Sequence, residues 1–137
     1  MKLEFLIVDD SDIVIFLHTE ILSYTNLTKS PYSALNGESA IEILQNLKGS
    51  QSEYLVLLDI NMPVMDGWQF LEEIQKDDTL PPIFVVMVTS SIDSIDKLKA
   101  AQFPQVIGFF EKPLSEENCY QIKALNQIQK YFSTTNK

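Results

Sequence analysis

Three stretches of this chain, Leu3–Val8, Tyr54–Leu58 and Ile83–Val88, are almost continuously apolar and contain many β-branched residues. A strand with one face in water alternates polar and apolar residues, whereas an unbroken apolar run is typical of a strand buried on both faces. Segments with apolar residues at helical spacing separate the runs. Strands that alternate with helices predict an α/β fold, in which helices cover both faces of a parallel sheet.

Two weaker strands complete the expected sheet. The first lies near residues 28–34 and is interrupted by Pro31, which favours an edge position because proline cannot donate to a strand ladder. The other is Val106–Phe110. The expected helices span about residues 13–22, 40–47, 67–74, 94–102 and 122–132. Asp10 or Ser11 is a suitable N-cap for the first helix, and Asp66 with Gly67 supplies a turn or cap before the third.

Length and charge limit the classes of protein. With 137 residues the chain fits one domain, expected to be 1–132 with a polar tail at 133–137. A net charge of −9 argues against nucleic-acid binding, which selects for clustered lysine and arginine. The lone Cys119 excludes a disulfide framework and is expected to be a buried or half-buried structural thiol. No apolar run is long enough for a signal peptide or a membrane span, so we expect a cytoplasmic protein.

Polar residues follow four of the five expected strands. They are Asp9, Asp10, Asp59, Thr89, Ser90, Lys112 and Pro113. In a parallel sheet the carboxyl ends of the strands share one edge, where ligands bind close to the point at which the strand order reverses. These residues are therefore expected to gather around one spot, although they are far apart in the sequence.

The expected cluster joins three carboxylates, a hydroxyl and one ammonium group. Clustered carboxylates repel one another unless a cation compensates for their charge. Mg²⁺ is suitable, because it takes oxygen ligands and keeps waters that a phosphate can replace. Metal and ammonium would neutralise the oxygens of a phosphoryl group while an aspartate attacks the phosphorus and forms an aspartyl-phosphate.

Four motifs give this cluster a more specific meaning. They are LIVDDSD, LVLLDINMPVMDG, VVMVTSS and GFFEKP, and they occur in this order over essentially the whole chain. Together they resemble the receiver domain of two-component response regulators, of the stand-alone type similar to the chemotaxis regulator. The resemblance implies a flavodoxin-like fold with strand order 2-1-3-4-5.

The resemblance also implies a role for each site residue. Asp59 would be the phosphoacceptor, and Mg²⁺ would be bound by Asp9, Asp10, Asp59 and the backbone carbonyl of Asn61. Lys112 would pair with the phosphoryl oxygens, and Pro113 would follow it across a cis peptide bond.

Two further residues would form the switch. Thr89 would move to hydrogen-bond the phosphoryl group, and Phe109 would follow it inward. Asn61 and Ser90 would tune how long the phosphoryl group lasts, because they flank the path of the attacking water.

The resemblance implies partners rather than a metabolic substrate. The phosphoryl donor would be a sensor histidine kinase or a phosphotransfer protein. The output would pass to an effector protein through the fourth helix, fifth strand and fifth helix, because no output domain is expected after Phe132. A homodimer through the same face is compatible with the resemblance. Catalysis would be limited to the chain's own phosphorylation and dephosphorylation.

Three alternatives remain open at this stage. A haloacid dehalogenase-type enzyme would carry a second acid at the position of Asn61, and a flavin-binding electron carrier would have a Ser/Thr/Gly-rich loop in place of DDSD. A receiver that acts purely as an interaction module would not need intact Asp59, Thr89 and Lys112. His18, within the first helix, is predicted to be a surface or partly buried residue without a functional role.

Overall fold

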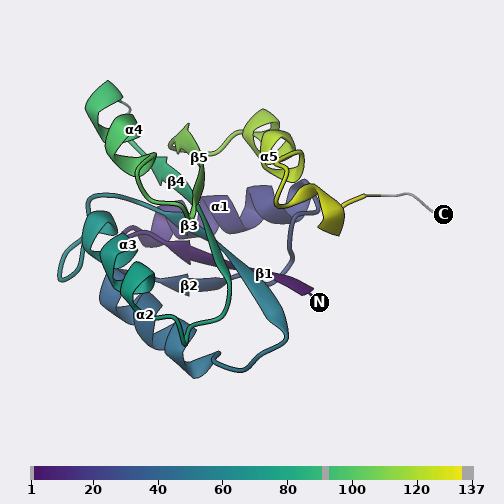
Figure 1. Ribbon diagram of the computed structural model, residues 1–137. Helices are drawn as coiled ribbons and strands as arrows, with labels where there is room; N and C mark the ends of the chain where they lie inside the picture. Colours follow the sequence, from purple (N-terminus) through teal and green to yellow (C-terminus); the bar gives the residue numbers. More distant parts are fainter. Residues whose placement is uncertain (1, 91–92, 134–137) are drawn as a thin grey trace.

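The computed structural model describes residues 2–90 and 93–133 (Figure 1). Five strands form a single sheet in the order β2-β1-β3-β4-β5, and every neighbouring pair is parallel. The strands are β1 (Lys2–Val8), β2 (Tyr32–Ala34), β3 (Ser52–Leu58), β4 (Ile83–Thr89) and β5 (Val106–Glu111). The predicted flavodoxin-like α/β fold and its strand order are confirmed.

Helices cover both faces of the sheet. They are α1 (Asp12–Tyr24), α2 (Gly37–Asn46), α3 (Gly67–Lys76), α4 (Ser94–Ala100) and α5 (Glu116–Lys123), followed by a 3₁₀ turn at Gln129–Tyr131. One apolar core lies beneath α2, α3 and α4, and a second lies beneath α1 and α5. Strands β1, β3 and β4 contribute to both cores, which explains their unbroken apolar sequences. No helix within the described ranges has the length and apolarity that crossing a bilayer requires.

Two elements differ from the prediction. Strand β2 begins only after Pro31 and has three residues, at the sheet edge that Pro31 had indicated. The last helix ends at Lys123 instead of continuing to Phe132. The chain then turns, buries Ile128 and forms the 3₁₀ turn, where the Tyr131 hydroxyl donates a hydrogen bond to Glu53 of β3. Helical spacing predicted the buried side of this segment but not its break, because a turn can bury the same residues.

Other local expectations agree with the structure. Ser11 caps α1, and Asp66 with Gln69 forms a capping box at the start of α3. Cys119 is a buried free thiol. Of the predicted tail at 133–137, residues 134–137 lie outside the described ranges.

Candidate functional site

Three acidic residues meet at the carboxyl ends of β1 and β3. Among the described residues, Asp9, Asp10 and Asp59 form a cluster whose carboxylate oxygens lie within 4.8 Å of one another. Backbone bonds hold two of them in place, because Asp59 N–H donates to Val8 O (3.0 Å) and Asp9 N–H donates to Ala34 O (3.1 Å). Asp9 and Asp59 are 2% and 4% exposed, whereas Asp10 is open to solvent.

Lys112 joins the two buried carboxylates. Its ammonium Nζ lies 3.0 Å from Asp9 Oδ2 and 3.1 Å from Asp59 Oδ2. The backbone of Lys112 is fixed at the end of β5, since its N–H donates to Thr89 O at 3.0 Å. The Lys112–Pro113 peptide bond is cis. The Lys112 ammonium therefore contacts the ends of both β1 and β3, although Lys112 itself follows β5, which lies on the other side of β4.

The electrostatics of the site favour added positive charge. Burial raises the pKa of Asp59, and the nearby Asp9 charge raises it further, while hydrogen bonds from Lys112 and Thr89 oppose the shift. Burial lowers the pKa of Lys112, but its bonds to Asp9 and Asp59 outweigh this and keep the pKa above its ordinary value. One ammonium group therefore does not fully compensate the buried carboxylates.

The donor set fits a hard divalent cation. The ligand atoms of the three clustered aspartates are carboxylate oxygens, the type of ligand that Mg²⁺ takes, and they lie within 4.8 Å of one another. Exposed Asp10 also leaves a wet side on which an ion could keep waters. Asn61 follows Asp59 by two residues and is exposed at the same strand end.

The remaining predicted site residues belong to β4 and β5. Thr89 is fully buried at the end of β4, where its side chain acts to lower the pKa of Asp59. Ser90 follows it and is exposed. Phe109 is half-buried on β5 and pairs in register with Met87 of β4. The fold thus brings Thr89, Lys112 and the acidic cluster together, while Phe109 lies on the side facing α4, with Lys97 Nζ 5.9 Å from its ring centroid.

Gly67 shapes the loop that follows Asp59. Its N–H donates to Ile60 O at 2.8 Å, and a Cβ atom at Gly67 would lie 2.5 Å from Asp59 O. The loop therefore folds back directly onto the backbone of Asp59. Only glycine permits this close approach, which explains why the turn after the acidic residue contains one.

Val64, in the same loop, has a left-handed backbone conformation with φ of 68°, and its side chain is exposed. A β-branched residue is disfavoured there by roughly 1–2 kcal/mol, whereas asparagine accepts this conformation more readily. We expect Val64→Asn to raise the free energy of unfolding by about 1 kcal/mol in urea denaturation. An unchanged or lower stability would contradict this interpretation of the loop.

His18 is the site neighbour that the sequence interpretation missed. It was predicted at or near the surface, but it is 2% exposed, and its Nε2 accepts a hydrogen bond from Leu114 N–H at 3.2 Å. Burial lowers the pKa of His18 to about 4, and the nearby Lys112 charge adds to this effect. Its position on α1 gave no signal, because the partner lies 96 residues further along the chain.

The low pKa of His18 makes stability depend on pH. The unfolded chain binds a proton at His18 near pH 6.5 and the folded chain only near 4, so stability is lost as the pH falls through this window. Relative to His18→Gln, we expect the wild type to lose about 2 kcal/mol of unfolding free energy between pH 7 and 5. Denaturant titrations of both proteins at the two pH values measure this difference. A pH-independent difference would contradict the assignment of a neutral, buried His18.

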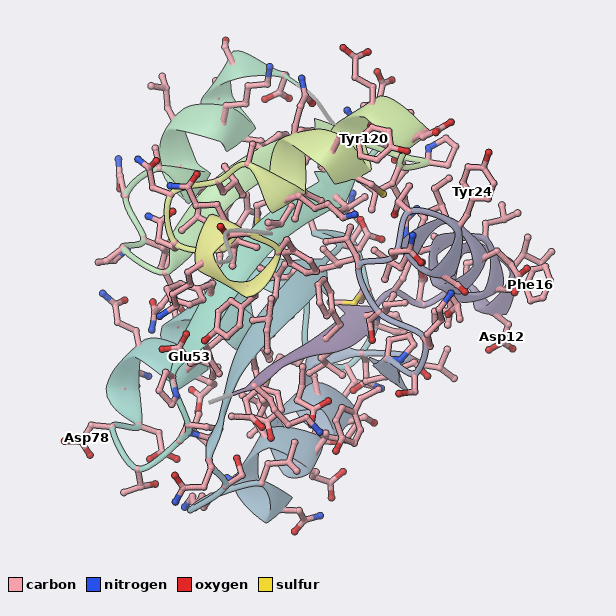
Figure 2. The ribbon with its side chains drawn as sticks, turned by 90° about the vertical axis from the view of Figure 1, so that its right-hand side faces the viewer. Asp12, Phe16, Tyr24, Glu53, Asp78 and Tyr120 are labelled. Atoms are coloured by element: carbon pink, nitrogen blue, oxygen red, sulfur yellow. The ribbon has the colours of Figure 1, made fainter. Side chains whose placement is uncertain are left out.

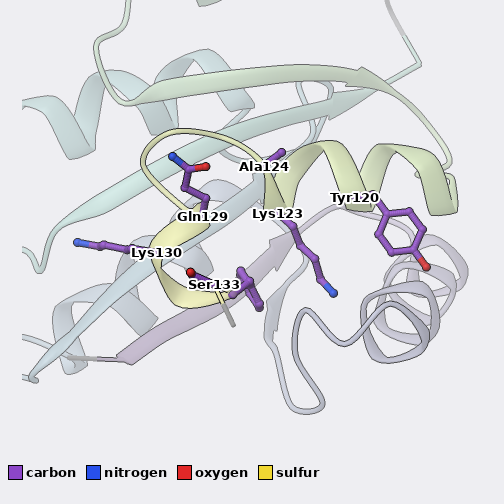
Figure 3. A pocket seen from close by; sticks show the side chains of 7 residues that line it. Tyr120, Lys123, Ala124, Gln129, Lys130 and Ser133 are labelled. Carbon is purple, nitrogen blue, oxygen red and sulfur yellow. The ribbon is translucent and has the colours of Figure 1, made fainter. Parts of the chain in front are cut away.

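A hollow on the described surface lies away from the acidic cluster. It has a volume of about 600 Å³ and is formed by α5 and the segment after it (Figure 3). Its lining residues are Tyr120, Lys123, Ala124, Gln129, Lys130, Phe132 and Ser133. None of the clustered carboxylates lines it.

Comparison with known proteins agrees with this geometry. The family model of the response regulator receiver domain matches residues 5–125, and the chain belongs to this family. A two-component response regulator from Cytophaga hutchinsonii superposes with a TM-score of 0.80 at 28% identity, over 95% of this chain and 99% of that one. A response regulator receiver protein from Dyadobacter fermentans gives 0.78 at 26% identity, over 96% and 99%.

Curated relatives are mostly longer than this chain. A protein-glutamate methylesterase/protein-glutamine glutaminase from Methanosarcina mazei is 29% identical over 93% of this chain, which spans 36% of that protein. The chain spans 10–20% of three other curated relatives. The likeness therefore extends to only part of the length of each of these proteins.

Proposed function

We propose that this protein is a cytoplasmic phosphorylation switch in which Asp59 accepts a phosphoryl group from a histidine kinase or a phosphotransfer protein. The observation that carries the proposal is the bridge from Lys112 to Asp9 and Asp59 beside exposed Asp10. A cluster of this charge and composition is suited to a phosphoryl group, whose oxygens need compensating positive charge. Family membership supports the same conclusion.

In the proposed reaction a carboxylate oxygen of Asp59 attacks phosphorus. A new O–P bond forms as the bond from phosphorus to the donor breaks, which releases the imidazole of a phosphohistidine or the acetate of acetyl phosphate. The fold holds Asp59 at the end of β3, beside solvent-exposed Asp10, where a phosphoryl donor is proposed to reach it. Hydrolysis by water later returns Asp59 to its carboxylate form.

Lys112 and Thr89 are the proposed partners of the transferred group. The Lys112 ammonium already contacts Asp59 and would follow the phosphoryl oxygens, and the Thr89 hydroxyl would donate to another of them. Mg²⁺ bound by Asp9, Asp10, Asp59 and the Asn61 carbonyl would neutralise the remaining negative charge. Asn61 and Ser90 are exposed beside the site and are proposed to set the access of the hydrolytic water.

The phosphoryl donor is proposed to dock on α1. Ile13, Phe16 and Tyr24 are exposed apolar residues on this helix, and Figure 2 shows Phe16 and Tyr24 pointing away from the domain. A hollow of about 420 Å³ between α1 and Pro113–Leu114 continues this surface toward the residue that follows Lys112. An exposed apolar patch that borders a reactive site is a typical docking surface for a protein partner.

We propose that the surface formed by α4, β5 and α5 binds the effector protein. Thr89 pairs in register with Glu111, and Met87 pairs with Phe109. A movement of Thr89 would therefore act directly on the neighbouring residues of β5. On α4, Ile95 and Leu98 are largely exposed and available to an effector or to a second copy of the chain. Phosphorylation would act by biasing Thr89 and Phe109 between two arrangements.

Intact mass spectrometry after incubation with Mg²⁺ and acetyl phosphate tests this proposal. The wild type should gain one phosphoryl group, and Asp59→Asn should gain none because its amide is not a nucleophile. Omission of Mg²⁺ should prevent the reaction. Asp66→Asn is the matched control, because Asp66 is an acidic residue of the same loop that caps α3.

Equal labelling of wild type and Asp59→Asn would overturn the assignment of Asp59. If no protein is labelled, binding of beryllofluoride with Mg²⁺ distinguishes a short-lived phosphoryl group from an inert interaction module. Binding by the wild type would support a switch whose phosphoryl group is short-lived, and no binding would contradict the proposed function.

A further inference from the structure

We propose that His18 is a positioning residue for Lys112, acting through the hydrogen bond that it accepts from Leu114. The proposal rests on the function proposed above, because Lys112 is placed there beside the phosphoryl group. No motif in the sequence assigns His18 a role. His18 lies on α1, and its side chain contacts the segment that carries Lys112.

The contact is buried and specific. His18 Nε2 lies 3.2 Å from Leu114 N, and His18 and Leu114 are only 2% and 6% exposed. A neutral imidazole has one acceptor nitrogen and one N–H, so the bond from Leu114 fixes the proton on Nδ1. The imidazole therefore satisfies a backbone donor that water could not easily reach.

Leu114 is two residues after Lys112, so this bond acts on the segment that presents the ammonium group. On one side the segment is fixed by Lys112 N–H, which donates to Thr89 O at 3.0 Å. On the other side it is fixed by His18. Between these anchors, exposed Pro113 makes no backbone N–H bond, because proline has none.

Loss of the second anchor should therefore loosen Lys112. The ammonium lies 3.0 Å from Asp9 and 3.1 Å from Asp59, and it must keep its place beside Asp59 to reach the oxygens of the transferred group. Catalytic groups misplaced by about 1 Å can lose on the order of 100-fold in rate. Among the described residues, the hydrogen bond of His18 is with Leu114 and not with the acidic cluster, so its positioning effect on Lys112 is expected to pass through the backbone.

Substitutions at position 18 can separate the effect of the hydrogen-bond acceptor from the effect of side-chain volume. His18→Gln places an amide oxygen at about the reach of Nε2 and keeps an acceptor for Leu114 N–H. His18→Leu keeps an apolar volume but removes the acceptor, and His18→Asn keeps an amide but has a shorter reach. Leu44→Ala is the matched stability control, because Leu44 is fully buried in the core on the opposite face of the sheet.

Two measurements test the proposal. One is the rate of Mg²⁺-dependent phosphorylation by acetyl phosphate at a temperature where all variants are folded. The other is amide hydrogen exchange of Leu114 and Lys112, which needs no phosphorylation. In His18→Leu we expect a phosphorylation rate at least tenfold slower and loss of the exchange protection of the Leu114 amide. In His18→Gln we expect both quantities to stay near their wild-type values. In Leu44→Ala we expect the phosphorylation rate to change less than threefold. If His18→Leu does not fold, His18→Asn takes its place.

The outcomes separate this proposal from the proposed function. If the wild type is phosphorylated and His18→Leu reacts equally fast, the positioning role is wrong. If Leu44→Ala is slowed as much as His18→Leu, the effect is general destabilisation and the role is also wrong. If the wild type is not phosphorylated and binds no beryllofluoride with Mg²⁺, the proposed function fails. Unchanged Leu114 exchange in His18→Leu would independently show that His18 does not hold the segment.

Discussion

Lys112→Met is expected to slow phosphorylation of Asp59 by about two orders of magnitude, because it removes a charged donor aimed at the transferred group. The Lys112 ammonium lies 3.0 and 3.1 Å from the two buried carboxylates, and methionine fills a similar volume without charge. The initial rate with saturating Mg²⁺ and acetyl phosphate measures the effect. Lys76→Met is the control, because Lys76 is an exposed lysine near the end of α3.

The same substitution should also reduce stability in the absence of Mg²⁺. Without the ammonium, Asp9 and Asp59 are buried like charges, which raises the pKa of Asp59 further and should cost about 2 kcal/mol at pH 7. Because a raised carboxyl pKa favours the protonated folded state, this loss should shrink as the pH falls toward 5. Addition of Mg²⁺ should reverse it in part. A Lys112→Met protein with wild-type rate and stability would contradict the role of the bridge.

Gly67→Ala is expected to destabilise the loop that follows Asp59. Its new Cβ atom would meet Asp59 O at 2.5 Å and Ile60 Cα at 2.9 Å, and both obstacles are backbone atoms. The loop must then move away from Asp59, at a cost of roughly 2–3 kcal/mol, and the phosphorylation rate should fall with it. Urea denaturation and the acetyl phosphate rate measure the two effects.

Gly108→Ala is the matched control for this prediction. At Gly108 the nearest atoms to a new Cβ are side-chain atoms of Phe110 and Val86, at 3.3 and 3.5 Å. Small rotations of those side chains can accommodate a methyl group, so we expect less than about 1 kcal/mol of destabilisation and an unchanged rate. Equal effects at Gly67 and Gly108 would show that the approach of the loop to Asp59 is not the cause.

The architecture could be predicted from the sequence because its main signals are local. Unbroken apolar runs such as Tyr54–Leu58 indicate strands buried on both faces, and each run ends where a polar residue begins. Parallel topology then requires Asp9, Asp59 and Lys112 to converge, and the structure places them in contact. Their convergence follows from the fold class, whereas their chemical roles depend on the family.

The features that were not predicted depend on contacts between distant parts of the chain. The buried His18 hydrogen-bonds to Leu114, and the segment after the last helix contacts β3 through Tyr131 and Glu53. Helical spacing contains no information about either partner. Similarly, the sequence did not indicate whether Phe109 or Phe110 faces α4. The two rings lie on opposite faces of β5, and both are half-buried.

Reduction with borohydride after acetyl phosphate treatment tests the central claim most directly, because it converts an acyl phosphate to an alcohol and marks the modified residue permanently. Peptide mass mapping should then find homoserine at position 59 in Mg²⁺-treated wild type, and aspartate there when Mg²⁺ is omitted. A reduced residue at another acidic position, with Asp59 unmodified, would contradict the account.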